Sequence, residues 1–444
     1  MLSAYHGMAS TAKQLCALGA MVDNAQISDG CNALIMSASA ANLKDSPELI
    51  STLVRYGAVV NARQLDGQTA LMVAACNGNT GAVKALIDLK ADLKACARNG
   101  STALFVAAAG GHNETIKALL KDGKEEIVNL TIQNGEHPYL LEHCGYQINL
   151  LQSFGSGVTA LMISAFKNHV STVKTLIEFH AKVDSVTEFG HTAVSLAARQ
   201  GHLDTVHCLK QMNANLYCQD GTGATPFLSA AMFGHTEMVK FLAGIDSKFV
   251  SAAMKNGTTA LMMTAMNGYV NTLHALVELK ADVAATIPIV DDRLALKVMR
   301  TALVNNQHVS ILDNITAAYG EGVNALMLAA YQGQDKAVNA LIRANADVNA
   351  ETKEGWTALM LAVQNNREPV AKVLVDHNAK VMASTVDSIT VFNLAQNNVN
   401  PGLVDLIRQN QAKEQTPESN SSGESSYAEQ GDGTPGTDQP EDQD

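Results

Sequence analysis

The densest group of side chains that could do chemistry lies between residues 136 and 144. Glu136, His137, Glu142, His143 and Cys144 supply carboxylate, imidazole and thiol groups, which are the ligands that zinc takes in proteins. The six-residue spacing of the two histidines does not place them on one helix face, and it matches no structural zinc pattern. We therefore interpret the group as a polar loop, and a catalytic or metal site here stays open as the alternative.

No other part of the sequence carries a motif for catalysis. The P-loop, GxGxxG, GxSxG and HExxH motifs are absent. Seven scattered cysteines without a CxxC pair are typical of reduced thiols in a cytoplasmic protein, where buried small side chains are their usual role. The sequence therefore predicts a non-enzymatic protein with no catalytic residue, no bound metal and no cofactor.

The chain repeats itself with a period of 33 residues. An anchor segment, Gly-x-Thr-Ala-Leu, begins at Gly67, Gly100, Gly157, Gly257 and Gly355, with looser copies at Gly190, Gly223 and Gly322. Most anchors are followed by a second glycine after eleven residues and by a leucine after nineteen residues. One further position, which predicts a structural hydrogen bond at a turn, holds His112, His169, His202 and His235. Such a period predicts a solenoid of stacked units.

Each unit has the signals of two short helices. Thr69 can cap the first helix, because its hydroxyl accepts from a backbone N–H that has no partner inside the helix. Residues 70–76 then form that helix, and Gly78 ends it in the left-handed conformation. A second helix over residues 82–89 has its apolar residues at helical spacing. Because one such pair is too short to bury its own apolar face, neighbouring pairs must stack.

This pattern resembles the ankyrin repeat. Residues 346–350, with the sequence Ala-Asp-Val-Asn-Ala, match the hairpin of that family, and the pair Gly201-His202 matches its inter-helix turn. The family's Thr-Pro-Leu-His is mostly Thr-Ala-Leu-Met here, and only Thr225-Pro226 keeps the proline. The resemblance implies an all-α fold, an ankyrin-repeat α-solenoid of helix-turn-helix repeats joined by short β-hairpin loops.

Residues 1–410 are expected to form one ankyrin repeat domain of about ten repeats. The first repeat is truncated, because Met1 aligns with Met72 inside a first helix; either the chain starts with an atypical cap or, as we favour, a preceding portion is missing. An irregular insertion covers residues 124–156, where the start of another repeat and a plain extended hairpin are both open interpretations. A degenerate repeat is expected over residues 285–320, with a bend between two stacks as an option.

The charge of the chain is concentrated at its end. Residues 411–444 carry nine acidic residues and one lysine, so they account for −8 of the net charge of −12. Their composition predicts an acidic disordered tail. The nearly neutral remainder gives no electrostatic footprint for nucleic acid, and no apolar run is long enough to span a membrane. We expect a cytoplasmic monomer with protein partners.

The resemblance implies that a partner binds along the concave face, at the ends of the first helices. Aromatic, methionine and arginine residues are enriched in protein interfaces. The candidate partner-binding residues are Phe166, Arg199, Met232, Phe233, Met266, Tyr331 and Trp356. Packing between repeats is the alternative role for the same side chains. We therefore predict a scaffold or adaptor, with a targeting module of a larger enzyme or of a secreted bacterial effector as the alternative.

Overall fold

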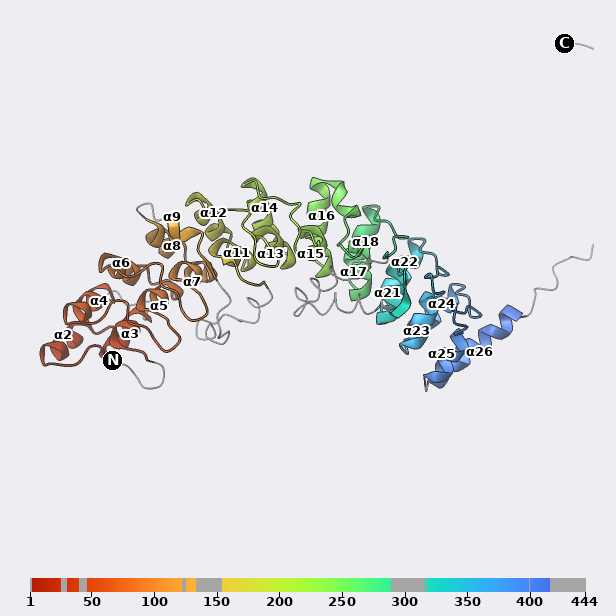
Figure 1. Ribbon diagram of the computed structural model, residues 1–444, viewed down its shortest axis with the longest axis horizontal. Helices are drawn as coiled ribbons and strands as arrows, with labels where there is room; N and C mark the ends of the chain where they lie inside the picture. The colour runs from red at the N-terminus through yellow and green to blue at the C-terminus, as the bar shows by residue number, and fades with distance from the viewer. Residues whose placement is uncertain are drawn as a thin grey trace, which may run out of the picture.

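The protein is an arch built from two layers of short helices (Figure 1). The computed structural model describes residues 2–24, 30–39, 46–121, 125–132, 154–288, 315, 318–398 and 400–415. In each repeat the first helix lies on the concave side of the arch and the second helix on the convex side. The two layers are called the inner and outer layer below.

The inner layer consists of the first helices of the repeats. They are α1 (Leu2–Tyr5), α3 (Ala33–Ser39), α5 (Ala70–Cys76), α7 (Ala103–Gly110), α11 (Ala160–Phe166), α13 (Ala193–Arg199), α15 (Pro226–Met232), α17 (Ala260–Asn267), α21 (Ala325–Gln332), α23 (Ala358–Gln364) and α25 (Val391–Asn397). Each packs against the inner helix before and after it.

The outer layer consists of the second helices. They are α2 (Ala9–Ala17), α4 (Ser46–Arg55), α6 (Thr80–Asp88), α8 (Asn113–Leu120), α12 (Val170–Glu178), α14 (Leu203–Gln211), α16 (Thr236–Ile245), α18 (Val270–Glu278), α22 (Asp335–Arg343), α24 (Glu368–Asp376) and α26 (Pro401–Gln415). Helix α26 therefore continues past residue 410, where the sequence places the start of the tail. The helical solenoid predicted from the sequence is confirmed.

The predicted caps form where the anchor places them. Thr69 accepts a hydrogen bond from the backbone N–H of Met72 (3.4 Å), and Asn324 caps α21 in the same way through Met327 (3.0 Å). Gly78, after the end of α5, has a φ of 67°, a conformation that costs a side chain but not glycine. Both ends of the short helices are thus specified locally.

Small side chains allow the inner helices to approach one another closely. In α7 every residue from Ala103 to Ala109 is buried, so this helix is enclosed on all sides. The leucine nineteen residues after each anchor points from the outer helix into the same core. All eight of these leucines are fully buried, namely Leu86, Leu119, Leu176, Leu209, Leu242, Leu276, Leu341 and Leu374. The core is therefore continuous along the arch, as the period requires.

Short hairpins connect the repeats. In several repeats the residue before the turn forms a β-bridge with the capping residue, as Arg63 does with Thr69 and Glu351 with Thr357. Successive hairpins are also joined, because the Asn61 side chain accepts from the backbone N–H of Asp92 (2.9 Å). These bonds supply partners for loop backbone that lies outside the helices.

The insertion after α8 leaves the stack unbroken. Helix α7 packs directly on α11, although 49 residues separate the end of one from the start of the other. The described part of the insertion contains α9 (Glu125–Val128) and strand β1 (Thr131–Ile132), which pairs antiparallel with β2 (Val158–Thr159). The group at residues 136–144 lies outside the described residues.

The repeat expected over residues 285–320 does not separate its neighbours in the stack. Helix α17 packs directly on α21, and α18 packs on α22. The backbone of Ile287 exchanges hydrogen bonds with Val323 and Gly322, so the described start of this segment pairs with the next anchor hairpin. Residues 289–314 lie outside the described residues. The degenerate repeat expected over residues 285–320, with a bend between two stacks as an option, therefore stays a prediction.

Direct stacking of α17 on α21 predicts that the intervening segment is dispensable for the fold. We expect that replacing residues 289–314 with a flexible Gly/Ser linker of about ten residues leaves one cooperative thermal transition. Circular dichroism at 222 nm measures it. Two separated transitions in the variant, with a single one in the parent chain, would show that the segment joins the two halves.

The hydroxyl of Thr258 offers a test of packing next to an anchor. Thr258 is fully buried, and its Oγ1 has no hydrogen-bond partner among the described residues. Valine stands at the same place in two other repeats, as Val158 and Val323, and both are buried. We expect Thr258→Val to raise the free energy of unfolding by about 1 kcal/mol, because a buried hydroxyl without a partner is costly. Urea denaturation measures the change.

The control for this substitution is Thr258→Ser, which keeps the hydroxyl and removes the methyl group. It is expected to lower the urea midpoint, because it leaves a small cavity. A lower midpoint for Thr258→Val as well would mean that the hydroxyl is stabilised in a way the packing does not reveal.

Candidate partner-binding face

The inner helices carry almost no charge. Among the described inner helices, Arg199 is the only charged residue. It is the last residue of α13, near the middle of the arch (Figure 1). Any charge recognition by these helices is therefore concentrated at this residue.

Arg199 lies against an aromatic ring from the next repeat. Its guanidinium carbon is 4.8 Å from the centroid of the Phe233 ring, and both side chains are half-buried. Phe233 follows the last residue of α15, so the contact spans the boundary between two repeats. Burial lowers the pKa of Arg199, and the negative charge of Asp220 opposes this change. The guanidinium stays charged at neutral pH, because its ordinary pKa is above 12.

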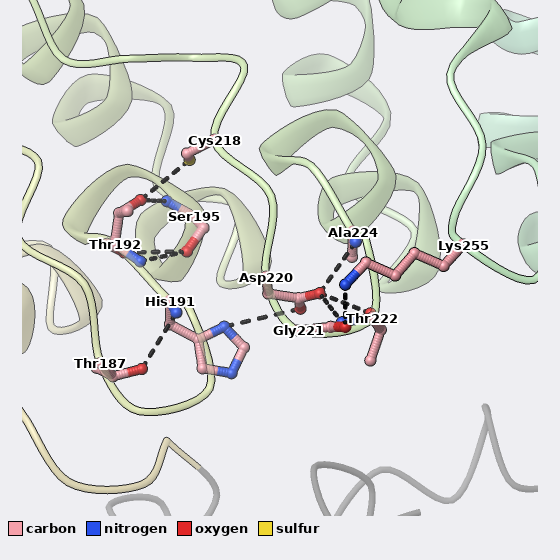
Figure 2. Close-up of polar contacts among 10 residues, drawn as sticks. All are labelled: Thr187, His191, Thr192, Ser195, Cys218, Asp220, Gly221, Thr222, Ala224 and Lys255. Atoms are coloured by element: carbon pink, nitrogen blue, oxygen red, sulfur yellow. Dashed lines mark hydrogen bonds and ion pairs between the residues drawn. The ribbon is translucent and has the colours of Figure 1, made fainter. Parts of the chain in front are cut away.

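Asp220 holds a fixed orientation through the backbone of its own hairpin. Its Oδ1 accepts from the backbone N–H groups of Thr222 (2.9 Å) and Ala224 (3.0 Å), and from the Thr222 hydroxyl (2.6 Å; Figure 2). In two other repeats a threonine, Thr187 or Thr352, stands three residues before the anchor glycine where Asp220 stands here. This exchange is the sequence signal that marks Asp220, which sequence reasoning missed.

The second oxygen of Asp220 faces a histidine. Asp220 Oδ2 is 3.8 Å from His191 Nδ1, and both side chains are 12% exposed (Figure 2). Burial lowers the pKa of His191, and the charge of Arg199 adds to this change while Asp220 opposes it. His191 is therefore neutral at pH 7. Lys255 lies beside the same hairpin and donates to the Gly221 carbonyl (2.9 Å).

Phe154 packs this polar group against the preceding repeat. Its ring centroid is 5.7 Å from His191 and 5.4 Å from Phe166, in edge-to-face geometry. Phe154 is 1% exposed and stands at the end of the insertion, outside the repeat register. For that reason the period gave no signal for it.

A row of hydrogen bonds fixes the ends of the inner helices. The N-cap histidine of an outer helix donates from Nε2 to a carbonyl near the end of the inner helix of the preceding repeat: His112 to Cys76 (2.9 Å), His169 to Ala109 (3.0 Å), His202 to Phe166 (2.9 Å) and His235 to Arg199 (2.8 Å). These carbonyls have no partner within their own helices. We call the row the carbonyl ladder. The predicted structural role of the four histidines is confirmed.

Other side chains continue the ladder toward the C-terminus. Gln334 donates to the Met266 carbonyl (3.4 Å), and Arg367 donates through Nε to the Tyr331 carbonyl (3.2 Å).

A family model described as ankyrin repeats (3 copies) matches residues 1–95, 38–134, 124–220, 196–287 and 295–385. The chain belongs to the ankyrin repeat family. Repeats of this family are generally protein–protein interaction modules.

One solved structure that is similar to this chain is the crystal structure of the human ASB11 ankyrin repeat domain. The two sequences are 17% identical, and the TM-score of the structural match is 0.45. The match covers 57% of this chain and 97% of that one. A search of curated proteins found no match.

Four of the candidate binding residues of this ankyrin protein are buried. Phe166, Met232, Met266 and Trp356 are 7%, 3%, 2% and 8% exposed. Burial of these four side chains favours packing between repeats, the alternative role that the sequence left open for them. Three of them lie in the last turn of an inner helix, where the next repeat covers them, and the residue after the anchor glycine, as at Trp356, is folded under its own hairpin.

Three candidates remain accessible on the inner layer. Arg199, Phe233 and Tyr331 are half-buried. Arg199 and Phe233 contact each other, whereas Tyr331 belongs to a second aromatic group with Tyr319 (6.0 Å between ring centroids). Tyr319 also contacts Trp356 (4.9 Å), and burial raises the pKa of Tyr319. Tyr331 therefore belongs to a group separate from Arg199 and Phe233.

The polar residues of the ankyrin face are arranged for structure and not for nucleophilic catalysis. The Ser195 hydroxyl accepts from the Thr192 N–H (2.9 Å) and the Thr192 hydroxyl accepts from the Ser195 N–H (3.2 Å), which together form a capping box (Figure 2). Burial raises the pKa of Cys218, so its sulfur stays a thiol.

Within the part of the chain that is described, no three His, Cys, Asp or Glu side chains are placed to hold a metal. In the same part, no helix is long and apolar enough to cross a membrane.

The carbonyl ladder predicts a pH-dependent stability. Burial lowers the pKa of His202 below its ordinary value of 6.5. The hydrogen bond to the Phe166 carbonyl opposes this change, and the charges of His235 and His169 add to it. The unfolded chain therefore binds a proton first as the pH falls, and the free energy of unfolding decreases below about pH 6.5. His202→Gln is expected to reduce this decrease, because glutamine already donates to the ladder at Gln334.

Thermal midpoints of both proteins between about pH 7.5 and 5.5 measure the difference. At the upper end the two midpoints are expected to be close, since the hydrogen bond to Phe166 is kept. Parallel curves for the two proteins over the whole range would show that His202 does not titrate differently on unfolding.

Proposed function

We propose that this ankyrin protein is a non-enzymatic scaffold that binds a protein partner along its inner helices. The observation that carries the proposal is the Arg199–Phe233 pair, an arginine stacked on an aromatic ring at the surface of an otherwise uncharged helix layer. Arginine and aromatic residues are the side chains most enriched at the energetic centres of interfaces. Tyr331 offers a second contact point further along the same layer.

The rigidity of the face supports this proposal. In the ladder the backbone carbonyl of Arg199 accepts a hydrogen bond from His235, and that of Tyr331 accepts one from Arg367. The backbone beneath both side chains is therefore held before any partner arrives. A preorganised surface limits the conformational entropy lost on binding, which favours affinity.

The compartment and the oligomeric state are part of the same proposal. Cys208 and Cys218 are free thiols, and burial raises the pKa of each. Unpaired buried thiols are typical of proteins in a reducing compartment, so we place the protein in the cytoplasm. A monomer leaves the whole inner layer available to a partner.

Affinity capture tests the proposed face. Phe233→Ala together with Tyr331→Ala removes the two half-buried rings and leaves the buried core intact. We expect the tagged double variant to capture at least roughly tenfold less of each partner from lysate than the parent chain does, because truncating hot-spot residues weakens binding strongly. Quantitative mass spectrometry measures the ratio for each captured protein.

The matched control is Tyr56→Ala. Tyr56 follows α4 in the outer layer and is 40% exposed, so its loss removes a ring from the other side of the arch. Its captured proteins are expected to equal those of the parent chain. Equal capture by all three proteins, with unchanged circular dichroism, would refute the inner layer as the binding face.

A further inference from the structure

We propose that Arg199 recognises a carboxylate of the partner, so that the partner presents an acidic segment with Asp or Glu to the middle of the inner layer. This inference rests on the proposed binding face and specifies the chemistry of what binds there. It follows from the charge of the layer, from the contacts of the guanidinium and from the groups around it.

Within the described inner helices one residue is charged, and Lys167, which directly follows α11, adds a second positive charge at the same end of the layer. The inner helices are composed of Ala, Leu, Met and other uncharged residues, and among those described Arg199 alone is ionised. A charge at the edge of an apolar, half-buried layer attracts an opposite charge more strongly than one in open water does. The only long-range charge complementarity that these helices offer is therefore toward an anion.

Within the described part of the chain, the guanidinium of Arg199 makes no side-chain hydrogen bond or ion pair. It lies over the Phe233 ring. An arginine has five N–H donors in a planar fork that fits a carboxylate with two parallel bonds. The contact with the Phe233 ring restricts the position of the guanidinium and so reduces the ordering cost of that fit.

The nearby acid does not fill this role. Asp220 acts on Arg199 through its charge, but its Oδ1 is held by Thr222 and Ala224, and its Oδ2 faces His191. His191 is neutral at pH 7, so it does not compete for an incoming anion or repel one. Lys255, beside the same hairpin, adds a second positive charge for the flanking part of an acidic segment.

Substitution of Arg199 leaves the structural bonds in place. Its contribution to the carbonyl ladder is the backbone carbonyl that accepts from His235, and this acceptor does not depend on the side chain. Arg199→Gln therefore removes the charge and the planar fork while retaining the helix end. Arg343→Gln is the matched control, because Arg343 ends outer helix α22 and is exposed.

Fluorescence anisotropy with three labelled peptides of one length tests the inference. One alternates Glu and Leu, the second replaces Glu with Gln, and the third replaces Glu with phosphoserine. We expect the full chain to bind the Glu peptide at least roughly tenfold more tightly than the Gln peptide. Arg199→Gln is expected to abolish this preference, and Arg343→Gln to keep it.

Equal affinity for the Glu and Gln peptides, or a Glu preference that survives Arg199→Gln, would overturn the inference. A clear preference for phosphoserine over Glu would overturn the choice of a carboxylate as the recognised group. Each result separates from the proposed face itself. If the rings Phe233 and Tyr331 are required for lysate capture while Arg199→Gln captures the same proteins, the face stands and the acidic partner fails.

Discussion

Stacking of one repeat on the next, locked by the carbonyl ladder, is the interaction on which the whole molecule depends. Each helix pair is too short to bury its apolar surface alone, so the core exists only between repeats. The ladder makes this packing specific, because the start of each outer helix must meet the last carbonyls of the inner helix in the preceding repeat. An example is the hydrogen bond from His202 to the Phe166 carbonyl. Because such bonds hold the ends of the inner helices, they also position the side chains at those ends.

The ladder also explains how the chain accommodates long interruptions. His169 reaches Ala109 across 60 residues of sequence, and Gln334 reaches Met266 across 68, with bonds of the same kind as those across 36 residues elsewhere. The stacking surfaces recognise each other regardless of the length of the connection, because closing a longer loop adds little entropy cost. Repeats on either side of an interruption therefore stack in the same way as repeats that follow each other directly.

An uncharged inner layer gives unusual weight to one residue. Because the small apolar side chains of the inner helices are consumed by packing between repeats, the candidate face consists of the few groups left at the helix ends. Arg199 and Phe233 meet there across a repeat boundary, with Asp220 and His191 setting the local field. Recognition is thus a property of the junction between two units and not of any single unit.

The sequence by itself determined the repeat, its caps and its fold class, because these depend on local signals such as Thr69, Gly78 and the buried leucine of each unit. The ladder histidines were identified in the same way. Only the tertiary structure decided which binding candidates are accessible: Phe166, Met266 and Trp356 are covered by neighbours, whereas Arg199 and Phe233 are not. The sequence period predicts which face of a helix a side chain lies on, but packing against the neighbouring repeats determines whether that side chain is buried. The same reason explains why Phe154 and the direct contact of α17 with α21 lay beyond sequence reasoning.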